Sequence, residues 1–201
     1  MASWWTITVP PGFQDVTAEA MQNPAFKASL DKMTVAGGTV TAHFWTNEDS
    51  VVLVLDASFA DMPNTMETLD GFEAGARKTS YGTGTEHAYT VEKDAFFIIS
   101  HQHATNSAKE VMWSNRWTGR GTDGALHSVG ATCSGNEGTC KAALATVKVD
   151  SKDFVKLSSL GSADNGAAYR IGYAVGVGLV CALLIGVYAK TRARKRAISG
   201  P

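Results

Sequence analysis

The chain has 201 residues and a formal net charge of −1. That length accommodates one globular domain with a buried core and one additional segment. The near-neutral charge gives no electrostatic basis for nucleic-acid binding by the domain, so we exclude this class of partner. The charge is unevenly placed, because residues 171–189 hold no Asp, Glu, Lys, Arg or His and a basic tail follows them directly.

Residues 171–189 carry the strongest pattern in the chain. At about 1.5 Å rise per residue, a helix of this length spans roughly 28 Å, close to the hydrocarbon thickness of a bilayer. We therefore predict a single-pass membrane protein. The predicted parts of the chain are a globular domain (1–150), a juxtamembrane linker (151–168), a transmembrane helix (169–189) and a basic cytoplasmic tail (190–201).

The domain begins with two short predicted elements. Apolar and threonine side chains alternate over residues 5–9, which predicts a half-buried strand. Pro10-Pro11-Gly12 ends this strand, because proline cannot donate to a ladder and glycine permits the turn. Residues 16–32 predict a short helix that Pro24 interrupts.

Two strands and a helix are predicted next. Alternating Val40, Ala42 and Phe44 predict a strand, and the apolar run 51–55 predicts a central strand covered on both faces. Helical spacing then predicts a helix that starts at residues 61–63 and reaches 79. Its expected apolar positions are Met66, Leu69, Phe72 and Ala76, and its expected solvent positions are Glu67, Asp70, Glu73, Arg77 and Lys78.

The second half of the domain predicts an antiparallel meander closed by a helix. The expected strands are 86–91, 95–103, 109–118 and 124–133, joined by segments rich in turn residues, and the expected final helix is 137–148. The fold class is therefore α+β, with a mostly antiparallel twisted sheet packed with helices.

The opening residues Trp5 to Asp15, in which a first strand runs into Pro10-Pro11-Gly12-Phe13, resemble the start of the PsbP-like superfamily. The later order of elements is also similar, and the resemblance covers residues 4–149. It implies a PsbP-like sandwich without catalytic activity of its own, whose members share the binding of a larger partner. The predicted C-terminal transmembrane helix is an addition to that family pattern.

Cys133 and Cys140 flank a turn-rich loop. A disulfide between them and a pair of reduced thiols are both compatible with this spacing, and the choice depends on the redox compartment.

His101 and His103 lie two apart on a predicted strand, so both imidazoles share one face. With His127 on a neighbouring strand, and Glu110 as the best fourth group, they are weak candidates for a metal site; a structural role is the alternative. The sequence shows no nucleophile elbow and no phosphate-binding loop. We therefore expect no enzyme activity and no cofactor.

Trp4 and Trp45 are candidate docking residues. Both are expected to be partly exposed, and exposed aromatic side chains are common anchors at interfaces. The alternative is that the tryptophans of this chain are core residues between sheet and helices.

The predicted transmembrane helix carries small residues at a spacing of four. This spacing allows close helix–helix packing in lipid, although glycine and alanine are also common in such helices. The two rows are Gly172 and Gly176, and Ala174, Gly178, Ala182 and Gly186. They predict association with transmembrane subunits of a larger complex or with a second copy of the helix.

Basic residues cluster immediately after the predicted helix, and the positive-inside rule then places the tail in the cytoplasm and the domain in the periplasm or a lumen. These residues are Lys190, Arg192, Arg194, Lys195 and Arg196. The start of the sequence has no signal-peptide pattern, so the alternative is a tail-anchored protein with a cytosolic domain.

Together these features predict a non-catalytic accessory subunit, whose domain docks on a larger membrane complex while its helix packs against partner helices. The alternatives are a membrane-tethered protein that binds a ligand or client, in the manner of a chaperone, and a metal-dependent enzyme.

Overall fold

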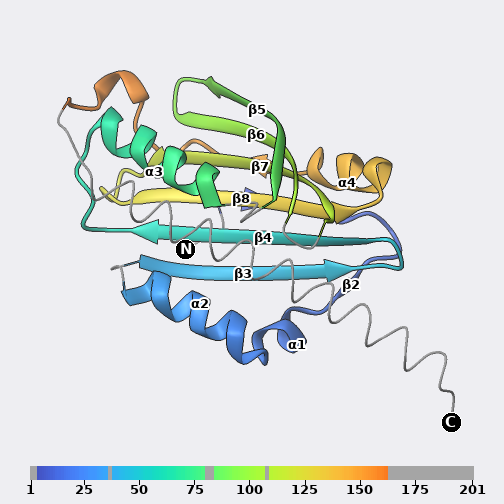
Figure 1. Cartoon of the computed structure of the whole chain (residues 1–201). Helices are drawn as coiled ribbons and strands as arrows, with labels where there is room; N and C mark the ends of the chain where they lie inside the picture. Colours follow the sequence, from blue (N-terminus) through green and yellow to red (C-terminus); the bar gives the residue numbers. More distant parts are fainter. Residues whose placement is uncertain (1–3, 36–37, 80–83, 107–108, 163–201) are drawn as a thin grey trace, which may run out of the picture.

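The computed structural model describes residues 4–35, 38–79, 84–106 and 109–162. Their main feature is a seven-stranded sheet of order β2-β3-β4-β8-β7-β6-β5, in which every neighbouring pair is antiparallel (Figure 1). A separate ladder joins β1 to β9. The predicted α+β class with a mostly antiparallel sheet is confirmed at this level.

The bounds of the elements are as follows. The strands are β1 (Trp5–Thr6), β2 (Gln14–Asp15), β3 (Gly38–Thr46), β4 (Ser50–Phe59), β5 (Thr85–Lys93), β6 (Phe97–Thr105), β7 (Val111–Arg120), β8 (Leu126–Gly135) and β9 (Lys148–Val149). The helices are α1 (Thr17–Met21), α2 (Pro24–Val35), α3 (Met66–Thr79) and α4 (Glu137–Leu144), with a 3-10 turn η1 (Leu157–Ser159).

Strand β4 is the central strand that the apolar run predicted. It lies between β3 and β8, and its side chains alternate between two separate cores. Leu53 and Leu55 enter the core on the side of α2 and α3, which we call the first face. Val52 and Val54 enter the core on the side of α4, the second face. Burial on both sides accounts for the absence of polar residues in this run.

The helices are unequally divided between the two faces. On the first face, Phe26 of α2 and Leu69 and Phe72 of α3 are fully buried against the sheet. Figure 1 shows α2 alongside β3 and α3 over the opposite half of the sheet. On the second face, Cys140 and Leu144 of α4 pack against side chains of β4 and β8.

The two ends of the predicted domain differ from expectation. The first strand includes only Trp5–Thr6 rather than residues 5–9, and the last helix ends at Leu144 rather than 148. The last helix stops short because Lys148–Val149 pair with β1 in a ladder instead of adding a third helical turn. The meander is confirmed, with strands displaced by about two residues, which is typical for boundaries.

The expected solvent position of Glu73 is wrong. Its residue exposure is 3%, because α3 lies over the half of the first face where buried serine and threonine side chains and Arg116 replace apolar ones. The apolar positions Leu69, Phe72 and Ala76 of this helix are buried as predicted.

Residues 151–162, expected as part of a linker, pack on the sheet. Phe154 and Leu157 are buried, the Leu157 N–H donates to Ala95 O at 2.8 Å, and the Gly161 N–H donates to Asn64 O at 3.2 Å. The domain therefore continues beyond the predicted boundary at 150.

Within the described ranges, no helix is long and apolar enough to cross a membrane. The predicted transmembrane helix, its two small-residue rows and the basic tail lie outside the described residues.

Candidate functional site

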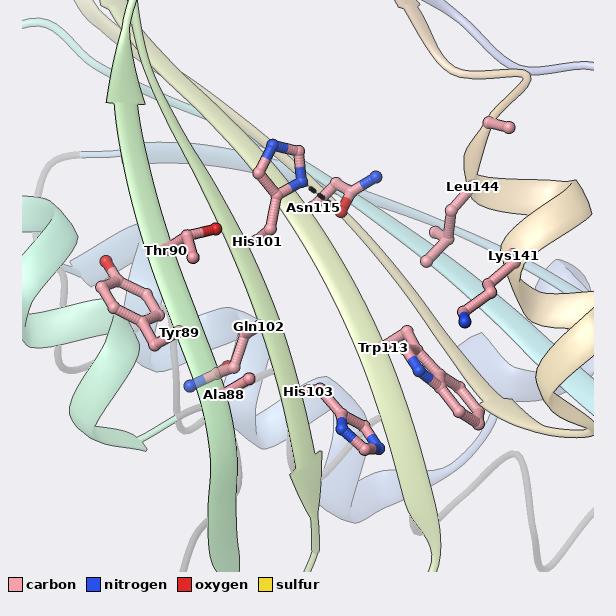
Figure 2. A pocket seen from close by; sticks show the side chains of 11 residues that line it. Ala88, Tyr89, Thr90, His101, Gln102, His103, Trp113, Asn115, Lys141 and Leu144 are labelled. Atoms are coloured by element: carbon pink, nitrogen blue, oxygen red, sulfur yellow. Dashed lines mark hydrogen bonds between the residues drawn. The ribbon is translucent and has the colours of Figure 1, made fainter.

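Helix α4 covers only part of the second face. It packs over β8 and β4, whereas the second-face side chains of β5, and those of β6 from Ile99 to Thr105, remain exposed or half-buried. An open groove of about 330 Å³ lies between α4 and strands β5, β6 and β7. Figure 2 shows its side chains, with α4 on one side and the three strands as the floor. This groove is the candidate functional site.

One row of aromatic rings runs across β5, β6 and β7, and two of its members, His103 and Trp113, line the groove. His103 pairs with Trp113 in register, and their rings stack at 5.3 Å between centroids. The His87 ring lies 5.1 Å from the His103 ring. Trp113 pairs in turn with Cys133 of β8. The row therefore connects the edge of the sheet to the covered core, and each ring supports the next.

A second, polar row lies beside the first. Thr90, His101 and Asn115 pair in register across β5, β6 and β7. His101 Nδ1 donates to Asn115 Oδ1 at 2.8 Å (Figure 2), which leaves the Asn115 amide with its two hydrogens to donate. His101 Nε2 lies 3.3 Å from Glu92 Oε1. This row therefore presents both donors, the Asn115 amide hydrogens, and an acceptor, the exposed Glu92 carboxylate.

Helix α4 forms the wall of the groove. Asn136 begins the helix by accepting the Thr139 N–H at 3.0 Å, an N-cap of the usual type. Cys133 and Cys140 form a disulfide with 5.2 Å between Cα atoms, which attaches the first turn of α4 to β8. Of the two alternatives that the sequence left open, the structure has the disulfide.

Two side chains of α4 line the groove, Leu144 and Lys141. The Lys141 ammonium lies 2.6 Å from Glu137 Oε1, and its hydrogen bond and charge lower the pKa of the Glu137 carboxyl. The wall thus contributes the apolar side chain of Leu144 and the ammonium group of Lys141, which is paired with the Glu137 carboxylate.

The same strands carry a buried ion pair on the first face. Arg116 Nη1 of β7 donates to Glu73 Oε1 of α3 at 3.0 Å, with side-chain exposures of 3% and 4%. Tyr89 of β5 donates its hydroxyl to the same oxygen at 3.0 Å. Burial, and then the Glu73 charge, raise the pKa of the Tyr89 hydroxyl. Strands β5 and β7 are therefore joined through α3 beneath the groove.

This ion pair is incompletely satisfied. Within the described part of the chain, Glu73 Oε2 and Arg116 Nε are buried without a hydrogen-bond partner. Groups of this kind carry a large desolvation cost and make a site sensitive to substitution.

The structure does not bring the three predicted metal-ligand candidates together. His101 and His103 do share a face and line the groove. His127 lies on β8 four residues from Ala131, the residue that is aligned with His101 through Asn115. Its Nε2 is 3.1 Å from Asp123 Oδ1. The Glu110 N–H donates to Asn106 Oδ1 at 3.0 Å. No cluster of three or more His, Cys, Asp or Glu side chains suited to a metal occurs among the described residues.

The two candidate docking tryptophans are both half-buried and lie outside the groove. Trp4 packs against Phe154 at 5.0 Å between ring centroids. Trp45 stacks on His43 at 5.9 Å. Each ring is partly accessible, and their role in docking stays a prediction.

Sequence reasoning missed three features of the groove region: His87, Lys141 and the Glu73–Arg116 pair. His87 joins the aromatic row because a β-bulge shifts the register between Glu86 and Ala88, and the sequence carries no signal for it. Lys141 has an ordinary helix-surface pattern.

Comparisons of the chain with protein-family models, with curated proteins and with solved structures find no match. The function is therefore inferred from the residues of the groove and its surroundings.

Proposed function

We propose that this protein is a non-catalytic, single-pass accessory subunit of a membrane complex. A PsbP-like domain docks on the partner through the groove beside α4, and the helix at 169–189 packs against partner helices. The observation that carries this proposal is the partly uncovered second face, where rings and polar groups line an open groove. Half-exposed aromatic side chains next to polar groups are typical of docking surfaces rather than of closed active sites.

The small-residue rows of the predicted helix supply the first test. Gly178→Leu puts a bulky side chain into the longer row, so we expect association with the partner helices to weaken by on the order of tenfold. The measurement is the amount of the membrane assembly that co-purifies with the full-length protein in mild detergent. Val177→Leu is the matched control, because helical spacing places it away from both small-residue rows. Recovery of the wild-type chain alone under all detergent conditions would contradict the proposal.

The domain is proposed to lie outside the cytoplasm, in a periplasm or lumen. The basic tail favours this orientation, and the Cys133–Cys140 disulfide is compatible with it, because disulfides persist in oxidising compartments. The alternative orientation is a tail anchor with a cytosolic domain.

Cysteine labelling distinguishes the two orientations. Thr39 is exposed on β3, so in a Cys181→Ala background we expect a membrane-impermeant maleimide to label Thr39→Cys in intact cells. The buried disulfide cysteines do not compete for the reagent. In a cell without organelles, labelling that occurs only after lysis would show a cytosolic domain and refute the proposed orientation. For a domain in an organelle lumen the test uses sealed organelles, and labelling of Thr39→Cys there without detergent would refute it.

A second candidate function is a membrane-tethered client-binding protein, which the open groove also favours. The two functions differ in what they require: a client binder captures its ligand without other subunits. Binding of a client by the purified full-length protein, with no stable assembly in the membrane, would favour this second function.

A further inference from the structure

A cluster of polar side chains lies beneath α3 on the first face of the sheet. Its centre is Arg116 of β7, which pairs in register with Ser100 of β6 and Gly130 of β8. Arg116 Nε lies 3.6 Å from the position that a Cβ would take at Gly130, so a long side chain there would compete with the guanidinium for the same space. Buried hydroxyl side chains two residues from Arg116 or Gly130 share this face. They are Ser114, Thr118, Ser128 and Thr132. With Arg116 and Ser100, we call them the polar cluster.

Glu73 of α3 places a carboxylate against the polar cluster, but it satisfies Arg116 only in part. The pair has one hydrogen bond, from Arg116 Nη1 to Glu73 Oε1 at 3.0 Å. Among the described residues, Arg116 Nε and Glu73 Oε2 are buried without a hydrogen-bond partner. A guanidinium and a carboxylate can form two parallel hydrogen bonds, which is the stronger arrangement. A carboxylate that is free to orient itself can therefore bind Arg116 better than Glu73 does.

The half of α3 that carries Glu73 is weakly built. Gly71 and Gly75 lie inside this helix, and interior glycines weaken a helix because they expose the backbone and restrict it least. Of the described residues after Glu73, the buried ones are Gly75 and Ala76, which cover little apolar surface. Arg77 adds an ion pair to β5 at the exposed surface. Segments with few buried apolar contacts open locally without global unfolding, so we expect residues 73–77 to open in this way.

We propose that the polar cluster is a binding site for a small carboxylate anion, and that Glu73 is the internal group that competes for it. When residues 73–77 open, the anion binds the Arg116 guanidinium and Glu73 is released to water. The Tyr89 hydroxyl, which donates to Glu73 Oε1 at 3.0 Å, then donates to the anion. The cluster holds the carboxyl group of one glutamate, so the ligand is about the size of acetate. This site lies on the opposite face of the sheet from the groove, and it does not depend on the proposed docking.

Amide hydrogen exchange of the full-length protein in mild detergent tests the site in the wild type. The probe is sodium acetate, on the order of 0.5 M, compared with sodium chloride at equal ionic strength. A ligand that binds the open form raises its population in proportion to ligand concentration over Kd, so a Kd on the order of 50 mM gives about tenfold faster exchange in residues 73–77. The Glu73→Leu, Arg116→Met double variant lacks both charges, and it should exchange equally in the two salts.

Glu73→Ala provides a second measurement, because it removes the competing carboxylate. Acetate should raise the urea midpoint of this variant, relative to chloride, by more than it raises the midpoint of the double variant. The double variant thereby corrects for the general effect of acetate on folding. If Glu73→Ala is unfolded in chloride, the expected result is that acetate restores its folding.

Either of two results would overturn the inference. One is equal exchange of residues 73–77 of the wild type in acetate and in chloride. The other is an acetate effect on Glu73→Ala that is no larger than the effect on the double variant. Rescue of Glu73→Ala without any change in the wild type also counts against a binding site, because it would make Glu73 a permanent partner of Arg116.

Discussion

Replacing Glu73 by alanine is expected to destabilise the domain by about 3–5 kcal/mol, because the variant leaves the Arg116 guanidinium buried without its carboxylate. The Arg116 side chain is 3% exposed, so water cannot replace the lost partner. The Tyr89 hydroxyl loses its acceptor in the same variant. The loss therefore reaches all three elements that meet at Glu73: α3, β5 and β7.

Urea unfolding of the full-length protein in mild detergent measures this effect. All five tryptophans lie at or before residue 117, so their fluorescence reports on the domain and not on the predicted membrane helix. Asp70→Ala is the control on the same helix. It breaks the exposed Lys93–Asp70 pair, with side chains 45% and 52% exposed, and should cost less than about 1 kcal/mol.

A double variant separates the buried charge from the packing. Glu73→Leu with Arg116→Met keeps similar volumes and removes both charges. Replacement of a buried ion pair by apolar side chains is often neutral or stabilising, by about 1–4 kcal/mol. We therefore expect the double variant to unfold at a higher urea concentration than either single one. Equal effects of Glu73→Ala and Asp70→Ala would contradict the importance of the pair.

Glu73 also shows what the sequence could predict of this helix and where the reasoning failed. Leu69, Phe72 and Ala76 defined the buried face, and Glu73 lies four residues after Leu69 and three before Ala76, on that same face. Its charge led to a solvent assignment against its spacing. The periodicity was the better guide, because Arg116 on β7 supplies a partner that only the fold brings near.

The sheet was largely predictable, whereas the groove was not. Alternation and the apolar run identified β3, β4 and the meander, since each strand has at least one buried face. The groove depends instead on which part of that sheet α4 leaves uncovered. It also depends on the bulge at Glu86 and Ala88 and on the disulfide. These features arise from register and tertiary packing, which local patterns do not encode.

The disulfide links the stability of the domain to the shape of the groove. It closes a short loop, with a sequence separation of 7 between Cys133 and Cys140. The chain-entropy relation for such a loop gives a loss of about 2.5 kcal/mol on its removal. The Cys133→Ala, Cys140→Ala double variant should therefore unfold at a lower urea concentration. Cys181→Ala should leave the domain unchanged, because that residue lies in the predicted membrane helix.

Reduction provides the matched experiment without a substitution. Dithiothreitol should lower the unfolding midpoint of the wild type but not that of the double variant, and alkylation before reduction should leave both cysteines unmodified. Free thiols in protein purified without reductant would contradict the disulfide. Because Cys140 is on the turn of α4 that precedes Lys141 and Leu144, loss of the bond also loosens the wall of the groove. Co-purification of the membrane assembly should then weaken on reduction in the wild type alone, which would connect the redox state of the compartment to docking at the groove.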